Sequence, residues 1–147
     1  MTTDLQPGKA FPLGAAVTAG GVNFSVYSRS ATTVELLFFD NADFYEFRDH
    51  VAGKLRVRAP LVPGVVSILS AAQITKFTQL CGAKIPPPLR AKLDALAGDD
   101  DAAADFGIEY ATRQCQDLLR AGVPGLHFYT LNKSHSTLRI LKNLGLA

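Results

Sequence analysis

Three consecutive acidic residues, Asp99, Asp100 and Asp101, form a compact set of potential metal ligands. Carboxylate oxygens are the ligands that hard divalent cations prefer, so the cluster could chelate a cation. The acids also stand directly before a long helical pattern, where a carboxylate caps unpaired backbone amides and complements the positive end of the helix dipole. We therefore interpret them as capping residues and predict no metal site.

The histidines and cysteines are the other residues whose types could support chemistry. His50 and His135 show no metal-ligand spacing, and His127 lies in an apolar run without an acidic or nucleophilic neighbour in sequence. Cys81 and Cys115 lie in separate helical patterns, which favours buried thiols in a reducing compartment over a disulfide or a metal pair. We expect no catalytic residue and no metal ligand among them.

Length, charge and hydropathy indicate the general class of protein. A chain of 147 residues with 48% hydrophobic content is sufficient for one globular unit. The formal charge of +2 is carried by scattered basic residues, so nucleic acid is not an expected partner. No apolar run is long enough to span a membrane and the first residues lack a signal pattern, which predicts a cytoplasmic protein.

The elements that would position a site are organised around residues 125–132, a short apolar run that is typical of a parallel strand covered on both faces. Asn132 is expected to cap a helix over residues 133–143. The apolar stripe of that helix would fold back over the strand; it comprises Leu138, Ile140, Leu141 and Leu144.

Earlier segments show the same alternation of strand and helix. Two strand-like runs flank a turn at Gly20 and Gly21, which predicts an N-terminal β-hairpin. Further strands are predicted at residues 34–39, 57–62 and 65–68, with helices at residues 41–53, 71–82, 86–96 and 102–121. The order from Val34 onward favours parallel β/α units, with ligands bound beyond the carboxyl ends of the strands.

Residues from about 36 to 147 resemble the C-terminal part of methylenetetrahydrofolate reductase, a flavin-dependent family with a (β/α)8 barrel. The motifs that carry the resemblance, in family order, are Phe38-Phe39-Asp40, Phe47-Arg48-Asp49, Val62-Pro63-Gly64, Gln73 with Phe77, Ile85-Pro86 and His127-Phe128-Tyr129-Thr130-Leu131-Asn132. The resemblance implies that strands ending near Asp40, Ile68 and Asn132 are the sixth, seventh and eighth of the barrel.

Residues from about 7 to 40 instead resemble the start of the N-terminal carbohydrate-binding module of glycogen debranching enzymes. The similar stretch, residues 12–28, reads Pro-Leu-Gly-Ala-Ala-Val-Thr-Ala-Gly-Gly-Val-Asn-Phe-Ser-Val-Tyr-Ser. The two resemblances overlap at residues 34–40, so the chain looks like a chimera of segments 1–40 and 36–147 that fold together. We expect an α/β fold: the last three β/α units of a barrel, with a β-hairpin beside or paired with them.

The reductase resemblance implies five folate- or flavin-binding residues: Gln73, Phe77, Tyr129, Leu131 and Lys133. Gln73 and Phe77 are four residues apart on a predicted helix and share a face. The Gln73 amide could hydrogen-bond the edge of a pterin, beside the Phe77 ring, which could stack on folate. The alternative for Phe77 is a core position. Two residues depart from the family pattern, because Leu36 and Lys133 replace an expected Gln and Arg, and Lys lacks the planar fork of Arg.

The implied activity is reduction of methylenetetrahydrofolate to methyltetrahydrofolate with bound FAD and a nicotinamide donor. The acidic catalytic residue and most flavin contacts of the family belong to the first five strands, so we expect the isolated chain to bind no FAD, to bind folate weakly and to be inactive. The alternatives are a folded chimera without retained chemistry or a glucan-binding segment. Open strand edges also predict self-association.

Overall fold

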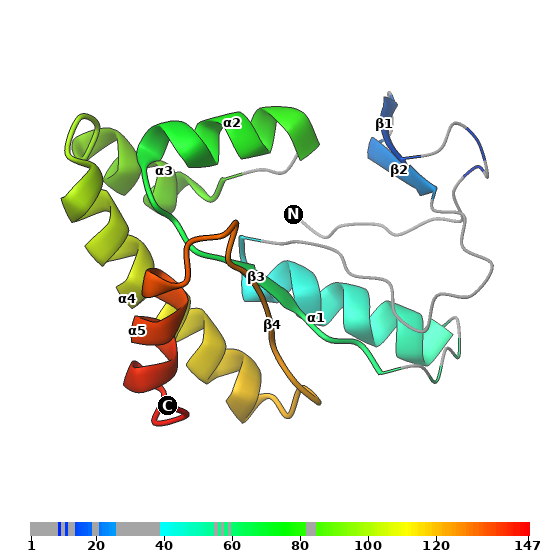
Figure 1. Cartoon of the computed structure of the whole chain (residues 1–147). Helices are drawn as coiled ribbons and strands as arrows, with labels where there is room; N and C mark the ends of the chain where they lie inside the picture. The colour runs from blue at the N-terminus through cyan, green and yellow to red at the C-terminus, as the bar shows by residue number, and fades with distance from the viewer. Residues whose placement is uncertain are drawn as a thin grey trace.

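The computed structural model describes residues 9, 11, 14–18, 21–25, 39–54, 56, 58, 60–81 and 85–147. Within them, helices surround a short parallel strand pair (Figure 1). The pair consists of β3 (Gly64–Val66) and β4 (His127–Tyr129), in a register that aligns Val65 with Phe128. The His127 amide donates to the Pro63 carbonyl at 3.0 Å, a bond that sets His127 opposite Gly64 at the start of the ladder.

Five α-helices and one π-helical turn complete this part of the chain. The first is α1 (Asn41–Asp49), which continues into the π turn η1 (His50–Lys54). The others are α2 (Ala71–Cys81), α3 (Pro87–Ala95), α4 (Asp100–Arg120) and α5 (His135–Asn143). None of the described helices combines the length and the apolar character that a membrane span requires.

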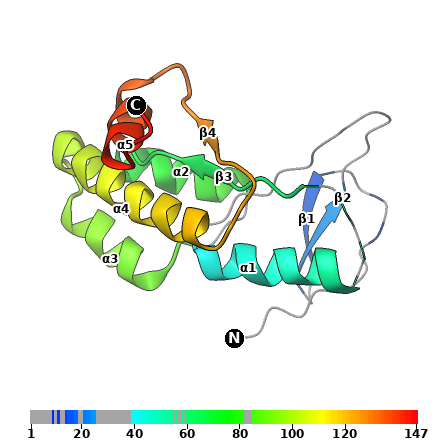
Figure 2. The same cartoon turned by 90° about the horizontal axis from the view of Figure 1, so that it is seen from below.

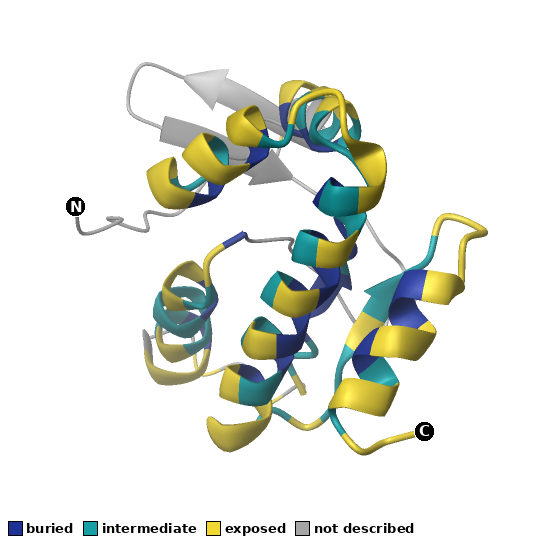
Figure 3. Cartoon of the chain, turned by 90° about the vertical axis from the view of Figure 1, so that its left-hand side faces the viewer, coloured by how far each residue is buried: buried dark blue, intermediate teal, exposed yellow. Residues whose placement is uncertain are grey.

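Helix α4 lies between two hydrophobic clusters, with α2 and α3 beyond one of its sides (Figures 1 and 2). The sheet core joins the strand pair to α1, α4 and α5, and its buried members are Phe44, Val65, Ile108, Ala111, Cys115, Leu118 and Ile140. The helical core joins α2 and α3 to the end of β3, and its buried members are Phe39, Ile68, Ile74, Leu89 and Leu93. Figure 3 shows the buried stripe along α4 and the exposed residues on its other side.

Capping signals in the sequence located most helix starts correctly. Asp99 Oδ1 accepts from the Ala102 amide at 2.9 Å, and Asp100 and Asp101 lie in the first turn of α4, as the capping interpretation predicts. Ser70 Oγ accepts from the Gln73 amide at 3.1 Å at the start of α2. No cluster of acidic, histidine and cysteine side chains suited to a metal ion occurs among the described residues.

Two strand predictions were wrong in extent. The described residues between 56 and 63 form no strand; Pro60 and Pro63 lack the amide that a ladder requires, and β3 begins only at Gly64. The strand predicted over residues 125–132 is reduced to β4, because Leu131 and Asn132 adopt positive φ angles of 51° and 62°. The prediction that this strand is covered on both faces is also wrong, since His127 is exposed.

The last helix differs from its prediction in its start and its buried face. It begins at His135, and Ser134 occupies the N-cap position that was expected for Asn132. Leu138 is 49% exposed, whereas the buried residues of α5 are Ser136, Thr137 and Ile140. Helical spacing explains the difference, because Thr137, Ile140 and the half-buried Leu144 repeat every three or four residues and Leu138 lies off that face.

The predicted hairpin is present as β1 (Gly14–Thr18) and β2 (Gly21–Ser25), which pair antiparallel with Val17 opposite Val22. Among the described residues it forms its own two-stranded sheet, separate from β3 and β4, which corresponds to the alternative of a hairpin that is not paired with the parallel strands. The strand predicted at residues 34–39 lies outside the described residues except for Phe39. The described part of the chain is therefore a mixed α/β structure with a two-stranded parallel sheet, and the barrel segment stays a prediction.

Gly107 is the point where α4 lies closest to the end of β3. A Cβ atom at this position would lie 2.4 Å from the Ile68 carbonyl oxygen. We expect Gly107→Ala to lower the free energy of unfolding by about 1–2 kcal/mol in urea denaturation, because overpacking costs roughly 1–3 kcal/mol and exceeds the gain of about 1 kcal/mol in helix propensity. Gly125→Ala, where a Cβ meets nothing within 4 Å, is the matched control. An unchanged or more stable Gly107→Ala protein would contradict the close approach.

Candidate functional site

The carboxyl ends of β3 and β4 lie at one edge of the sheet, because the two strands are parallel and in register. Gln73 and Phe77 belong to α2, which follows β3 in the chain. Tyr129 is the last residue of β4, and Leu131 and Lys133 follow it in the connection to α5. The structure therefore groups all five predicted binding residues on segments that leave the same edge.

Gln73 takes part in a reciprocal cap at the start of α2. The backbone N–H of Gln73 donates to Ser70 Oγ, and the side-chain Oε1 of Gln73 accepts from the backbone N–H of Leu69 at 2.8 Å. This arrangement is close to a capping box, in which the residue at the third helical position reaches back to the chain before the helix. The carboxamide oxygen already accepts one hydrogen bond, so a ligand contact is assigned to the donating side-chain nitrogen.

Phe77 lies one turn after Gln73 and is half-buried. It belongs to neither the sheet core nor the helical core. Its half-buried position is compatible with a ligand contact and with packing at the margin of the core, so both interpretations of Phe77 stay predictions.

The side chains at the end of β4 present a stacked pair. The His127 and Tyr129 rings lie 4.7 Å apart between centroids with an angle of 17° between their planes, on the same face of the strand. Beyond them Leu131 is 46% exposed and Lys133 is exposed, with the Lys133 amide donating to the Thr130 carbonyl at 2.8 Å. The edge thus offers aromatic, aliphatic and cationic groups.

None of these five residues lines either of the two cavities described below. They supply one amide nitrogen, two aromatic rings, one aliphatic side chain and one ammonium group, with no amide-rich cradle for a pyrophosphate. This set does not fit a complete FAD site, although it suits a few contacts to a flat heterocycle.

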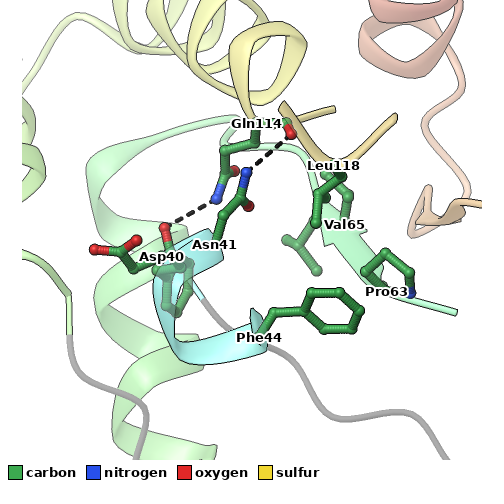
Figure 4. Close-up of a pocket in the computed structure, with 10 residues that line it drawn as sticks. Asp40, Asn41, Phe44, Pro63, Val65, Gln114 and Leu118 are labelled. Atoms are coloured by element: carbon green, nitrogen blue, oxygen red, sulfur yellow. Dashed lines mark hydrogen bonds between the residues drawn. The ribbon is translucent and has the colours of Figure 1, made fainter. Parts of the chain in front are cut away.

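A second polar arrangement, which the sequence reasoning missed, attaches α4 to the start of α1 (Figure 4). Tyr110 Oη and Gln114 Nε2 donate to the Phe39 carbonyl at 2.7 and 2.9 Å. Asn41 Nδ2 donates to the Gln114 carbonyl at 3.0 Å and to Asp117 Oδ2 at 2.8 Å. The available signal was the spacing of Tyr110, Gln114 and Asp117, which lie four and seven residues apart on one helix face.

Hydrogen bonding and burial shift the ionisation of this network. Tyr45 Oη donates to Asp117 Oδ2 at 2.6 Å. This bond, together with the one from Asn41, lowers the pKa of the Asp117 carboxyl. Burial and the same carboxylate raise the pKa of Tyr45 to about 12, and burial raises the pKa of Tyr110. The phenols are therefore neutral donors at physiological pH.

A small cavity of about 20 Å³ lies beside the network, between Asn41, Phe44, Val65 and Leu118. Figure 4 shows the Phe44 ring and the Val65 side chain at this cavity. Its volume is close to that of a single water molecule. This cavity is too small for a substrate, and on this side the network is a structural attachment between α1 and α4.

Comparison with known proteins identifies relatives of most of the chain. A family model described as Methylenetetrahydrofolate reductase matches residues 30–145. The chain is 35% identical over 113 residues to Methylenetetrahydrofolate reductase (NADH) 1 of Arabidopsis thaliana, covering 77% of this chain and 19% of that protein. It is 34% identical over 112 residues to Probable methylenetetrahydrofolate reductase (NADPH) of Caenorhabditis elegans, covering 75% of this chain and 17% of that protein.

A bacterial relative is covered to a greater extent. The chain is 29% identical over 108 residues to 5,10-methylenetetrahydrofolate reductase of Pectobacterium carotovorum subsp. carotovorum, covering 74% of this chain and 36% of that protein. The chain thus spans about a fifth to a third of these relatives. The family match does not include residues 7–29, where the similarity to the debranching-enzyme module stays a prediction.

The Asp117 network generates a prediction about acid stability. The folded-state pKa of Asp117 is below the reference value of 3.8, so its charge stabilises the fold above pH 3.8 and this contribution is lost as the pH falls through the lowered pKa. We expect Asp117→Asn to reduce the free energy of unfolding by about 0.5–1 kcal/mol at pH 7, because the carboxylate is exposed. The deficit should shrink in urea denaturation below pH 3.8.

Asp94→Asn is the matched control, because Asp94 is exposed on α3 and its carboxylate is outside the network. It should change stability little at either pH. Equal effects of the two substitutions, or an Asp117→Asn deficit that does not depend on pH, would contradict the assigned network.

Proposed function

Since the chain belongs to the methylenetetrahydrofolate reductase family, we propose that it is the folate-side segment of a flavin-dependent reductase and that the isolated chain does not complete the reaction. The observation that supports this most directly is the parallel pairing of β3 with β4. This pairing brings two family-like segments, one after each strand, to the same edge of a sheet. In open and closed parallel sheets alike, ligands bind at that edge.

Each candidate residue has a defined role in the proposed site. The side-chain nitrogen of Gln73 would donate to an acceptor on the edge of a pterin, because its oxygen is already bound to the Leu69 amide. Phe77 would stack on the flat part of folate. Tyr129 and Leu131 would line the opposite side, and Lys133 would attract a folate carboxylate as a point charge.

The reaction needs more than these contacts. Reduction of methylenetetrahydrofolate passes a hydride through a flavin in this family, and the flavin chemistry belongs to the bound cofactor. The described residues do not form a flavin cradle, so no step of a hydride transfer is assigned to them. We propose that this chain holds part of the folate and that the acidic catalytic residue and flavin contacts belong to family segments that it does not match.

The proposal predicts weak folate binding without turnover. The purified 147-residue chain should be colourless, and it should not oxidise NADH when FAD and methylenetetrahydrofolate are added. Folate-dependent NADH oxidation or co-purified flavin would contradict the proposed incompleteness. Absorbance spectra and the 340 nm signal of NADH are the measurements.

The folate contact has its own readout. We expect tetrahydrofolate to bind weakly in calorimetry and Phe77→Ala to weaken it about threefold or more, since an aromatic stacking pair contributes roughly 0.5–1.5 kcal/mol. Lys76→Ala, an exposed residue on the same helix, is the matched control. If neither protein binds tetrahydrofolate, a folded chimera with no retained chemistry becomes the better description.

We also propose weak self-association through strand edges. In the described part of the chain β3 and β4 each pair with one strand, which leaves one edge of each without a ladder partner there. Unpaired strand edges recruit further strands. Sedimentation velocity should show a mass that rises with protein concentration, whereas a constant monomer mass at high concentration would contradict this proposal.

A further inference from the structure

An open groove of about 460 Å³ lies between α3, the start of α1 and one face of α4. Its volume is within the range of small-molecule sites, roughly 300–1,000 Å³. None of the five residues assigned to folate lines it. The groove is therefore separate from the proposed folate edge, and its character comes from its own residues.

The floor of the groove is apolar and aromatic. Leu89 of α3 is buried, and Phe106 and Tyr110 lie one turn apart on α4 with ring centroids 6.0 Å apart. Both rings are half-buried, so they anchor in the helical core and still present surface to the groove. The bond from Tyr110 Oη to the Phe39 carbonyl holds one ring in a fixed orientation. The two ring planes are inclined at 42°, so a planar molecule would stack flat on one ring and contact the other at an angle. Because the Tyr110 ring is already held in place, little binding energy would be lost to its ordering.

The charged residues of the groove differ in the hydrogen bonds and ion pairs that they already make within the fold. Asp40 Oδ1 accepts from the Ala42 amide, and Asp117 accepts from Asn41 and Tyr45, so both carboxylates have donors within the fold. Lys92 is exposed, and within the described residues no carboxylate lies within ion-pair distance of its ammonium group. The two carboxylates keep their charge and already accept hydrogen bonds, whereas the Lys92 ammonium has no described carboxylate beside it, so an anionic ligand would meet this cation directly.

The cationic groups stand next to the aromatic floor. Lys92 Nζ lies 5.9 Å from the centroid of the Phe106 ring. Arg113 follows Tyr110 on the same face of α4, and its only described ion pair is an exposed contact of 3.6 Å with Glu109. A ring and a positive charge thus occur side by side along one wall.

We propose that this groove binds a planar aromatic carboxylate. The ring of the ligand lies against Phe106 and Tyr110 of α4, and its carboxylate lies beside Lys92 of α3, with Arg113 of α4 as the second cation that lines the groove. The acids at the other end, already hydrogen-bonded, disfavour a second negative group there. The ligand class is accordingly a monoanion with one flat apolar ring system, and the site does not depend on the folate proposal.

The probe for this site is 2-naphthoate, compared with the uncharged 2-naphthamide in calorimetry on the full chain. We expect 2-naphthoate to bind and the amide to bind at least about threefold more weakly, the change that loss of one exposed charge pair produces. Lys92→Gln should weaken 2-naphthoate by a similar factor and should leave 2-naphthamide unaffected. Lys76→Gln on α2, outside the groove, should change neither.

The ring contact needs a separate variant. Phe106→Leu should weaken both probes, because the stacking surface is reduced, and its thermal midpoint reports whether the fold is retained. Because Lys92 is exposed, its variant tests the charge contact even if Phe106→Leu unfolds. Absence of 2-naphthoate binding, equal affinity for acid and amide, or an unchanged affinity in Lys92→Gln would overturn the proposal.

Discussion

The close approach of α4 to the end of β3 is the contact on which the rest of the described structure depends. Only a residue without a side chain fits at Gly107, because the Ile68 carbonyl and Cβ occupy the space that a side chain would need. The neighbours of Gly107 then face opposite ways: Ile108 enters the sheet core and Phe106 packs on the helical core. One backbone contact therefore fixes a helix that both cores share.

The same helix also determines where the polar groups gather. Its hydrogen bonds to Phe39 and Asn41 join residues about 70 positions apart in the chain, and they hold the segment that enters α1. Because Tyr110 takes part in this attachment and also lines the groove against α3, structural and binding surfaces are coupled along one helix face. The residues proposed to contact folate lie on α2, at the end of β4 and beyond it, on segments that leave the parallel strand pair.

The candidate folate edge has chemical variety and little enclosure. A buried ligand gains from being surrounded, since desolvation strengthens each polar contact and limits its motion. At this edge Leu131 and Lys133 are exposed and Gln73 uses its oxygen to cap a helix. The proposed contacts therefore include exposed groups, which is consistent with the weak binding that we propose.

The sequence by itself determined the helices, because the signals that begin them are local. Asp99 and Ser70 provide side-chain oxygens to amides three residues away, and the prolines before Leu89 suit a first helical turn. It also determined the family, since the resemblance over residues 36–147 lies almost entirely within the family match over residues 30–145. The short extent of β3 and β4 was not apparent, because an apolar run indicates burial without showing where the ladder has partners.

Only the tertiary structure decided which polar groups meet. Nothing local links Tyr110 or Gln114 to the Phe39 carbonyl, because a long-range hydrogen bond depends on how α4 crosses β3 at Gly107. The exposure of Leu138 and the half-buried position of Phe77 were likewise decided by packing, since the pattern of a helix shows its apolar side but not which neighbours cover it. Local sequence signals determine where the helices begin. Contacts between segments that are distant in the chain determine which residues remain exposed.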